Sequence, residues 1–214
     1  MTVSTSAASK AAMLARASSR ANIAAFEAAE VEAVIVNAAG CGAHLKGYDH
    51  LLRKDPAWRD RAAAFAARVQ DVTEFLGRRP LAGTLGPVPL RATYHDPCHL
   101  AHGQKIRAQP RDLLRAVPGL ELVDLPESEM CCGSAGLYNL TEPVMARRLL
   151  DRKMGHVLST GAQAVVTANP GCLLQLAAGL RERGNPAPVY HVVEVLDRAY
   201  AAAEAQAGDG SPTR

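Results

Sequence analysis

Short apolar runs alternate with longer helical patterns along the whole chain. Short runs rich in β-branched side chains predict strands over Val34–Val36, Leu90–Tyr94, Leu120–Val123, Ala164–Thr167 and Val189–His191. Longer segments with apolar residues at helical spacing predict helices over Ala7–Ala29, Trp58–Leu76, Pro110–Ala116, Glu142–Thr160, Leu173–Arg183 and Val192–Ala205. Because alternation of strands and helices favours a parallel sheet covered by helices, the pattern predicts the α/β class.

Part of this pattern occurs twice. The segments Val31–Cys41 and Ala162–Cys172 align at an offset of 131 residues, and each contains a short strand that leads to Gly-Cys. We therefore expect two pseudo-repeated cysteine-rich α/β units with parallel sheets. At the same offset the counterpart of Cys132 falls at Met1, so we expect the first unit to be incomplete at its N-terminus.

Glycine, proline and apolar residues predict the domain organisation. We expect residues 1–78 to form the C-terminal half of a first cysteine-rich unit and residues 90–205 to form a complete second one. Residues 79–89 are rich in glycine and proline, which predicts a linker. Residues 206–214 have no apolar pattern and are expected to form a disordered tail.

Composition excludes several classes of function. The hydrophobic share of 48% and the charged share of 21% are ordinary for a globular protein. A net charge of +3 and an aromatic share of 4% argue against a nucleic-acid partner. No apolar stretch approaches the roughly 20 residues of a membrane span. A basic run at helical spacing is interpreted as a solvated helix face; it consists of Arg147, Arg148, Arg152 and Lys153.

The cysteines carry the strongest chemical signal. Adjacent cysteines seldom bridge each other, so Cys131-Cys132 indicates two thiolates that share a metal centre. Cys98 and Cys172 also follow predicted strands, and the carboxyl ends of parallel strands meet at one edge of a sheet. Five cysteines without a secretion signal are typical of a reducing compartment, where such clusters hold metals.

The residues leave three kinds of site open. Four thiolates could hold an iron–sulfur cluster, or they could hold a structural zinc ion in a module without a redox role. In the third interpretation Cys98 is an activated nucleophile beside His95, His99 and His102. For the metal interpretations, Gly133 and Gly171 would let the backbone approach the cofactor. Cys41 would belong to a separate, incomplete site or be a buried hydrophobic residue.

Several motifs resemble one family. His95-Asp96-Pro97-Cys98-His99, Met130-Cys131-Cys132-Gly133 and Asn169-Pro170-Gly171-Cys172 resemble the cysteine-rich "CCG" domain of heterodisulfide-reductase-like proteins. The same motifs, in the same order, resemble the iron–sulfur subunits of glycolate oxidases. The resemblance runs from about Ala21 to Tyr200.

This resemblance implies a role in electron transfer. A member of the family would be a non-catalytic subunit that passes electrons from an FAD-containing glycolate oxidase subunit, which oxidises glycolate to glyoxylate, toward the respiratory chain. Related subunits serve lactate or another 2-hydroxy acid. The implied location is the cytoplasm, with peripheral association with the cytoplasmic face of the inner membrane.

Two departures from the family pattern modify this expectation. The chain has no Cys-x-x-Cys-x-x-Cys run, so the N-terminal ferredoxin-like portion of the family is missing, and we expect the chain alone to be inactive. Where relatives often end in Cys-x-x-Cys, this chain has Cys172 and Gln175. The resemblance therefore favours a 4Fe-4S cluster held by Cys98, Cys131, Cys132 and Cys172 over a five-thiolate cluster.

Overall fold

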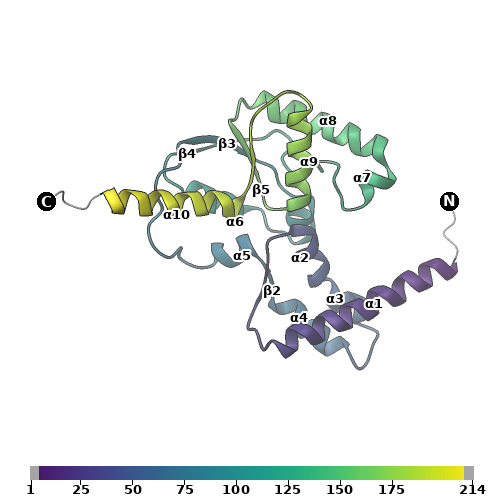
Figure 1. Cartoon of the computed structure of the whole chain (residues 1–214). Helices are drawn as coiled ribbons and strands as arrows, with labels where there is room; N and C mark the ends of the chain where they lie inside the picture. The colour runs from purple at the N-terminus through teal and green to yellow at the C-terminus, as the bar shows by residue number, and fades with distance from the viewer. Residues whose placement is uncertain (1–4, 210–214) are drawn as a thin grey trace. The chain divides into compact units, whose positions relative to one another are not determined.

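A computed structural model describes the backbone of residues 5–209 (Figure 1). The described chain divides into two compact units. The first contains residues 5–36 and 41–71, and the second contains residues 37–40 and 72–209. Within the described residues, no helix has both the length and the apolar character needed to cross a membrane.

The first unit is built on two short parallel strands. Its elements are α1 (Thr5–Ala28), β1 (Val34–Val36), most of α2 (Ala39–Lys46), α3 (Tyr48–Leu52), α4 (Arg59–Arg68) and β2 (Val69–Asp71). β1 and β2 pair in parallel, with Val34 opposite Val69. Phe65 and Tyr48 stack at the centre of a core that α1, α3 and α4 close around the strands.

The second unit contains a four-stranded parallel sheet in the order β4-β3-β5-β6. The strands are β3 (Leu90–Tyr94), β4 (Leu120–Val123), β5 (Ala164–Thr167) and β6 (Val189–His191). The helices are α5 (Val72–Gly77), the π-helix η1 (His99–Gly103), α6 (Ala108–Arg115), α7 (Tyr138–Thr141), α8 (Pro143–Ser159), α9 (Pro170–Arg181) and α10 (Val192–Asp209).

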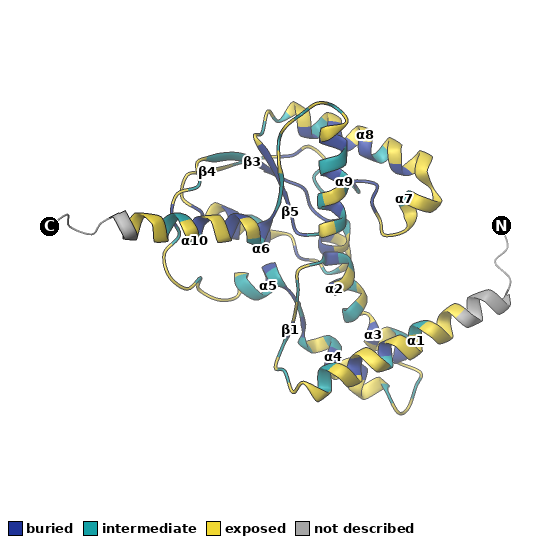
Figure 2. Cartoon of the chain, in the orientation of Figure 1, coloured by how far each residue is buried: buried dark blue, intermediate teal, exposed yellow. Residues whose placement is uncertain are grey.

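Both faces of this sheet are covered, as the dark central strands in Figure 2 show. Ala164 and Val166 pack into a core formed with α6 and α10. Val165, between them in the strand, points to the opposite face and packs against α8 and α9. The α/β class with parallel sheets is therefore confirmed.

Two segments of the chain repeat the same element order around their strands. A helix, a strand, a helix, a parallel partner strand and a helix follow one another as α1-β1-α2…β2-α5 and as α8-β5-α9-β6-α10. The second strand and helix of each copy share the pattern Val-x-x-Val-x-Glu-x-Leu, at Val69–Leu76 and Val189–Leu196. The offset there is 120 residues, because α3 and α4 lengthen the first copy. The pseudo-repeat is thus visible in both topology and sequence.

One expected helix is interrupted. The sequence predicts a single helix over Trp58–Leu76, but α4 ends at Arg68 and the next residue, Val69, is extended. Residues Val69–Asp71 pair with β1, and α5 begins immediately afterwards. The prediction was wrong because strand pairing overrides helix propensity in this short segment.

The predicted linker, which lies within the second unit, and the end of the chain also have defined structure. Residues 79–89 contain no helix or strand, yet the Gly86 amide donates to the Ala199 carbonyl oxygen (2.8 Å), and Leu81 and Leu85 pack on the core of the second unit. α10 continues to Asp209, past the expected end at Ala205, because alanine-rich sequence favours helix. The predicted disordered tail is therefore helical over 206–209, and residues 210–214 lie outside the described part.

Candidate metal centre

The carboxyl ends of β3, β4 and β5 carry the four cysteines that the sequence singled out. Cys98 follows β3, Cys131 and Cys132 follow β4, and Cys172 follows β5. The chain leaves β3 toward β4 on one side and later returns to β5 on the other side of β3. The cysteines therefore lie at the topological switch point of the sheet, where open α/β folds bind their ligands.

The four thiols form a continuous set, which we call the cysteine row. Cys98 interacts with Cys131, Cys131 with Cys132, and Cys132 with Cys172. One half of the row is more deeply buried than the other: Cys98 and Cys131 are half-buried, whereas Cys132 is 1% and Cys172 5% exposed. The structure thus brings together all four of the sequence-predicted thiolate ligands of the second unit.

Protons are distributed unevenly along the cysteine row. Hydrogen bonds from the Cys132 and Cys98 thiols lower the pKa of Cys131, and a hydrogen bond from Cys132 likewise lowers the pKa of Cys172. Donating those bonds raises the pKa of Cys98 and of Cys132, and burial raises both further. These directions favour negative charge on Cys131 and Cys172 in the metal-free row, an arrangement that attracts cations.

His95 lies at the buried end of the row. Its backbone amide donates to the Val166 carbonyl oxygen (2.9 Å), which extends the pairing of β3 with β5 by one residue and fixes the imidazole inside. One ring nitrogen, the Cys132 sulfur and the Cys172 sulfur all lie within 4.8 Å of one another. Among the described residues, this is the one group of three or more histidine, cysteine or acidic ligand atoms that converges so closely.

Neutral donors surround the sulfur atoms. The Gly133 amide donates to Cys131 Sγ (3.3 Å), and Asn169 Nδ2 donates to Cys172 Sγ (3.4 Å). Cys172 lies in the first turn of α9, which begins at Pro170 rather than at Leu173 as the sequence predicted, because Pro170 occupies the first helical position. The positive end of that helix also favours a thiolate at Cys172.

Two glycines permit the close packing of this region. Gly133 has φ = +90°, and a Cβ atom there would lie 2.3 Å from the Ala146 carbonyl oxygen of α8. A Cβ atom on Gly171 would lie 3.1 Å from the Ser134 hydroxyl oxygen, with the Asn169 amide 3.2 Å away. These positions therefore bring backbone against backbone and against polar side chains beside the cysteines.

Ion pairs hold the loop that precedes Cys131. Arg111 of α6 makes a bidentate pair with Asp96, whose side chain is 2% exposed, at 2.7 and 2.6 Å. The Asp96 amide donates to the Ser128 carbonyl oxygen (3.2 Å), and Arg107 pairs with Glu129 (2.7 Å). The hydrogen-bonded pair with Asp96 raises the pKa of Arg111. The cysteine-bearing loops after β3 and β4 are thereby fastened to each other and to α6.

Lys153 is a residue whose role the sequence did not reveal. The sequence placed it on a solvated basic face, but Lys153 is fully buried, and its ammonium donates to the carbonyl oxygens of Glu127 and Ser128. Burial lowers the pKa of Lys153 to about 8, while the nearby Cys132 sulfur opposes that shift. The exposed Arg147, Arg148 and Arg152 do fit the solvated face. Helical spacing could not separate Lys153 from them, because its burial depends on the loop folded over α8.

Cys41 is not part of the row. It is exposed and belongs to the first unit, in the first turn of α2. It is not a buried hydrophobic residue. Within the described residues of the first unit, no group of three or more potential metal ligands converges. A separate site at Cys41 stays a prediction.

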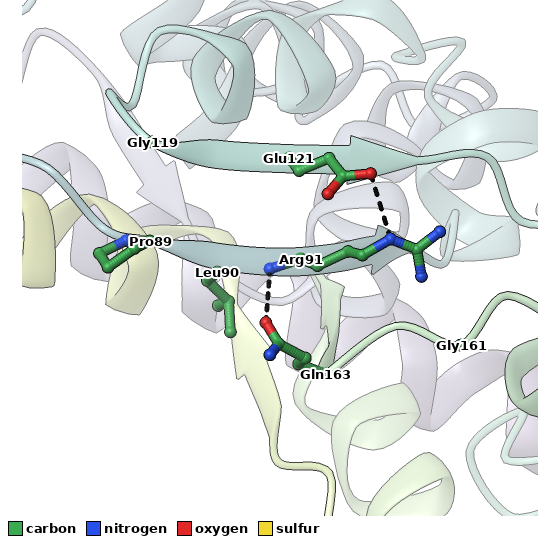
Figure 3. Close-up of a pocket in the computed structure, with 7 residues that line it drawn as sticks. All are labelled: Pro89, Leu90, Arg91, Gly119, Glu121, Gly161 and Gln163. Carbon is green, nitrogen blue, oxygen red and sulfur yellow. Dashed lines mark hydrogen bonds and ion pairs between the residues drawn. The ribbon is translucent and has the colours of Figure 1, made fainter.

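A second concave region lies at the opposite end of the sheet. A shallow pocket of about 430 Å³ lies at the amino ends of β3 and β4. Arg91, Glu121 and Gln163 are among the residues that line it (Figure 3). The Arg91 guanidinium pairs with Glu121 (3.1 Å), and the Arg91 backbone amide donates a hydrogen bond to Gln163 Oε1 (2.9 Å). The polar groups drawn there bond to one another, so they close the end of the sheet.

The residues present fit a thiolate-bound metal centre. Four cysteines face one another, two carry lowered pKa values, and a buried histidine directs a nitrogen toward two of the sulfurs. Soft sulfur donors with one imidazole suit iron–sulfur clusters or zinc. The raised pKa of Cys98 disfavours the third interpretation, an activated nucleophile, because a nucleophilic cysteine needs a lowered pKa.

Comparison with known proteins places this site in context. The cysteine-rich domain family, CCG, matches residues 4–46 and 92–177. The probable glycolate oxidase iron–sulfur subunit of Bacillus subtilis is 44% identical over 179 residues, which is 82% of this chain and 40% of that protein. The glycolate oxidase iron–sulfur subunit of Escherichia coli is 36% identical over 171 residues, 80% of this chain and 40% of that protein.

A shorter relative is covered more fully. Lactate utilization protein A of Exiguobacterium sp. is 34% identical over 173 residues, which is 80% of this chain and 71% of that protein. The chain thus spans about 40% of the length of the two glycolate oxidase relatives and most of the length of this third one.

Proposed function

The chain belongs to the cysteine-rich domain family, and from that premise we propose that it is an iron–sulfur electron-transfer subunit of a 2-hydroxy-acid oxidase or dehydrogenase complex. Cys98, Cys131, Cys132 and Cys172 hold the cluster in this proposal. The observation that carries it is the cysteine row, in which four thiols distant in sequence meet at the switch point of one sheet. When bound, an iron–sulfur cluster supplies reversible one-electron transfer.

The residues around the row would suit that role. Gly133 and Asn169 donate hydrogen bonds to sulfur, which stabilise a negatively charged centre. Burial of Cys132 and Cys172 keeps water from the inner side, whereas the half-buried Cys98 and Cys131 form the side nearer to solvent. Gly133 and Gly171 allow the backbone to lie close to the centre.

The finer details of the proposal rest on the relatives. We propose glycolate as the substrate of the complex, with lactate as the alternative, since both kinds of relative are similar to this chain. An FAD-containing partner subunit would oxidise the substrate, and a ferredoxin-like portion would complete the electron path. We propose a 4Fe-4S cluster, a complete cysteine-rich domain over residues 90–205, and a cytoplasmic location with peripheral association with the inner membrane.

Spectroscopy of the anaerobically purified protein tests the proposal. We expect iron and acid-labile sulfide, broad absorption near ~400 nm, and an EPR signal after reduction with dithionite. Replacing Cys131→Ser or Cys132→Ser should abolish the absorption. The matched control is Cys41→Ser, which should leave the absorption unchanged because Cys41 is exposed and lies outside the row.

The alternatives give different results. A colourless protein with one equivalent of zinc, retained through aerobic purification and lost in Cys132→Ser, would replace the redox role with a structural metal site. Equal loss of absorption in Cys41→Ser and Cys131→Ser would show that the centre includes Cys41. Material that contains neither iron nor zinc would refute a metal centre.

A further inference from the structure

The imidazole of His95 is a buried polar group of the second unit, and both of its ring nitrogens lack a conventional hydrogen bond. The residue is fully buried, and neither ring nitrogen meets strict hydrogen-bonding geometry with a protein atom, although the ring lies beside the Cys172 sulfur and helps to lower the pKa of Cys172. A neutral imidazole carries one N–H donor and one acceptor nitrogen. Leaving such a group unpaired inside a protein costs about 1–3 kcal/mol per polar atom. A buried side chain of this kind therefore indicates a partner that is not a protein atom.

The surroundings of the ring show what that partner is. One ring nitrogen lies within 4.8 Å of both Cys132 Sγ and Cys172 Sγ, and the two sulfurs lie within the same distance of each other. Sulfur and nitrogen atoms bound to one tetrahedral metal ion, with bonds of about 2.3 and 2.0 Å, are separated by roughly 3.5–3.8 Å. The limit of 4.8 Å on the distances between the three donor atoms is therefore compatible with such a set.

A hydrogen bond to Cys172 alone does not account for the position of the ring. The imidazole interacts with the Cys172 sulfur and lowers the pKa of Cys172. The same ring nitrogen also lies within 4.8 Å of the Cys132 sulfur, which a bond to one thiolate would not require. The backbone of His95 is fixed as well, because its amide donates to the Val166 carbonyl oxygen of β5. The imidazole is therefore fixed where an ion could lie between it and the two cysteines.

We propose that His95 is a direct ligand of the metal centre on its buried side, where its ring nitrogen converges with the Cys132 and Cys172 sulfurs. The centre then has mixed nitrogen and sulfur coordination, with Cys98 and Cys131 at its outer side. This inference rests on the proposed function, which requires only the four thiolates. It adds a neutral ligand where another thiolate would add negative charge, and a histidine ligand raises the reduction potential of an iron–sulfur centre.

Spectroscopy on the wild-type chain tests the ligand directly. The protein is purified anaerobically, reconstituted with ferrous iron and sulfide, and examined by X-ray absorption at the iron edge. We expect a light-atom contribution at about 2.0 Å beside the sulfur contributions. In protein labelled with ¹⁵N-histidine, pulsed EPR of the reduced state should show strong coupling from a directly bound nitrogen. Neither measurement depends on the folding of a variant.

Variants identify the histidine. His95→Ala should remove the strong nitrogen coupling, and His95→Cys should retain iron while its midpoint potential falls. The matched control is His99→Ala, because the exposed His99 places Nδ1 3.6 Å from Cys98 Sγ at the outer side of the row. This control should keep the strong coupling.

The outcomes separate the inference from the proposed function. An iron–sulfur cluster with only the weak coupling of a hydrogen-bonded imidazole would refute the ligand and leave the electron-transfer role intact. Loss of the strong coupling in His99→Ala but not in His95→Ala would identify His99 as the ligand and refute the assignment of His95. If the protein binds zinc instead, absorption at the zinc edge applies the same test. A protein without metal would refute both proposals.

Discussion

At the scale of single residues, the uneven sharing of protons along the cysteine row makes Cys98 and Cys131, the two half-buried members, chemically different. Cys98 and Cys131 are both half-buried, but the pKa of Cys98 is raised and that of Cys131 is lowered. At neutral pH the first is a thiol and the second a thiolate, and only thiolates attack alkylating reagents.

We therefore predict that iodoacetamide modifies Cys131 of the metal-free protein at least about tenfold faster than Cys98 at pH 7, since each unit of pKa changes the thiolate fraction tenfold. The rate of modification at Cys131 should stay nearly constant as the pH falls from 8 to 6, whereas the reaction of iodoacetamide with glutathione in the same solution should slow. Quenched labelling with peptide mass spectrometry measures both rates. Faster modification of Cys98 would instead favour the nucleophilic interpretation.

Lys153 presents a second residue-scale effect. Its buried ammonium donates to the carbonyl oxygens of Glu127 and Ser128 and lies near the Cys132 sulfur. With a pKa lowered by burial to about 8, it still carries its proton at pH 7 and loses it as the pH rises above 8. It therefore both fastens the loop before Cys131 and offsets the charge of the thiolates.

Replacing Lys153→Met should lower the free energy of unfolding by about 2–4 kcal/mol, because two buried carbonyl oxygens lose a charged donor. Urea denaturation of the metal-bound protein measures the loss. The midpoint potential of the centre should also fall, since a nearby positive charge is removed. Arg148→Met, an exposed change on the same helix, should alter the free energy of unfolding by less than about 0.5 kcal/mol. Equal stability of the two variants would contradict this account.

At the scale of elements, the contact of the Cys131–Gly133 loop with α8 depends on the missing side chain at Gly133. A methyl group there would be forced into a left-handed backbone conformation and against the Ala146 carbonyl oxygen at 2.3 Å. Gly136 offers a natural comparison, because it also has positive φ (+64°) but no atom within 4 Å of the added carbon.

Gly133→Ala should therefore cost about 2–4 kcal/mol of stability and reduce the amount of bound metal, because strain and overpacking add. Gly136→Ala should cost only the conformational part, roughly 1–2 kcal/mol, and should retain the metal. Denaturant unfolding and metal analysis of both variants provide the comparison. Similar losses in the two variants would show that the packing against α8 is unimportant.

Elements also show what sequence could and could not predict. The apolar strands β3, β4 and β5 begin and end where expected, because a continuous buried run such as Ala164–Thr167 has few alternatives in a parallel sheet. β2 escaped prediction because Val69-Gln70-Asp71 is short and polar and becomes a strand only through its pairing with β1. The same reasoning applies to the site. Cysteine chemistry identified the row, whereas the roles of His95 and Lys153 depend on burial that arises only in the folded sheet.

At the scale of the whole molecule, the two copies of the repeated α/β arrangement differ in the potential metal ligands that they bring together. In the second unit the cysteine after β5 meets three others from the loops after β3 and β4. In the first, Cys41 is exposed, and the described residues of that unit include no converging set of ligands. The repeat therefore conserves topology without conserving the site, since ligands arise from loops that a shared element order does not fix.

Because the proposed ligands come from three separate loops of one sheet, metal binding should be coupled to the stability of the second unit. A group that binds only the folded state stabilises it by mass action, and an unfolded chain cannot bring Cys98, Cys132 and Cys172 together. We predict that the metal-free protein unfolds roughly 10 °C below the metal-bound protein, as expected for about 3–5 kcal/mol in a chain of this size. Differential scanning calorimetry under argon, before and after removal of the metal by a chelator, measures the shift.

Cys41→Ser should show the same shift, whereas Cys132→Ser should unfold at the lower temperature whether or not metal is supplied. Identical unfolding temperatures for the metal-bound and metal-free wild type would mean that the cysteine row does not bind metal as part of the fold.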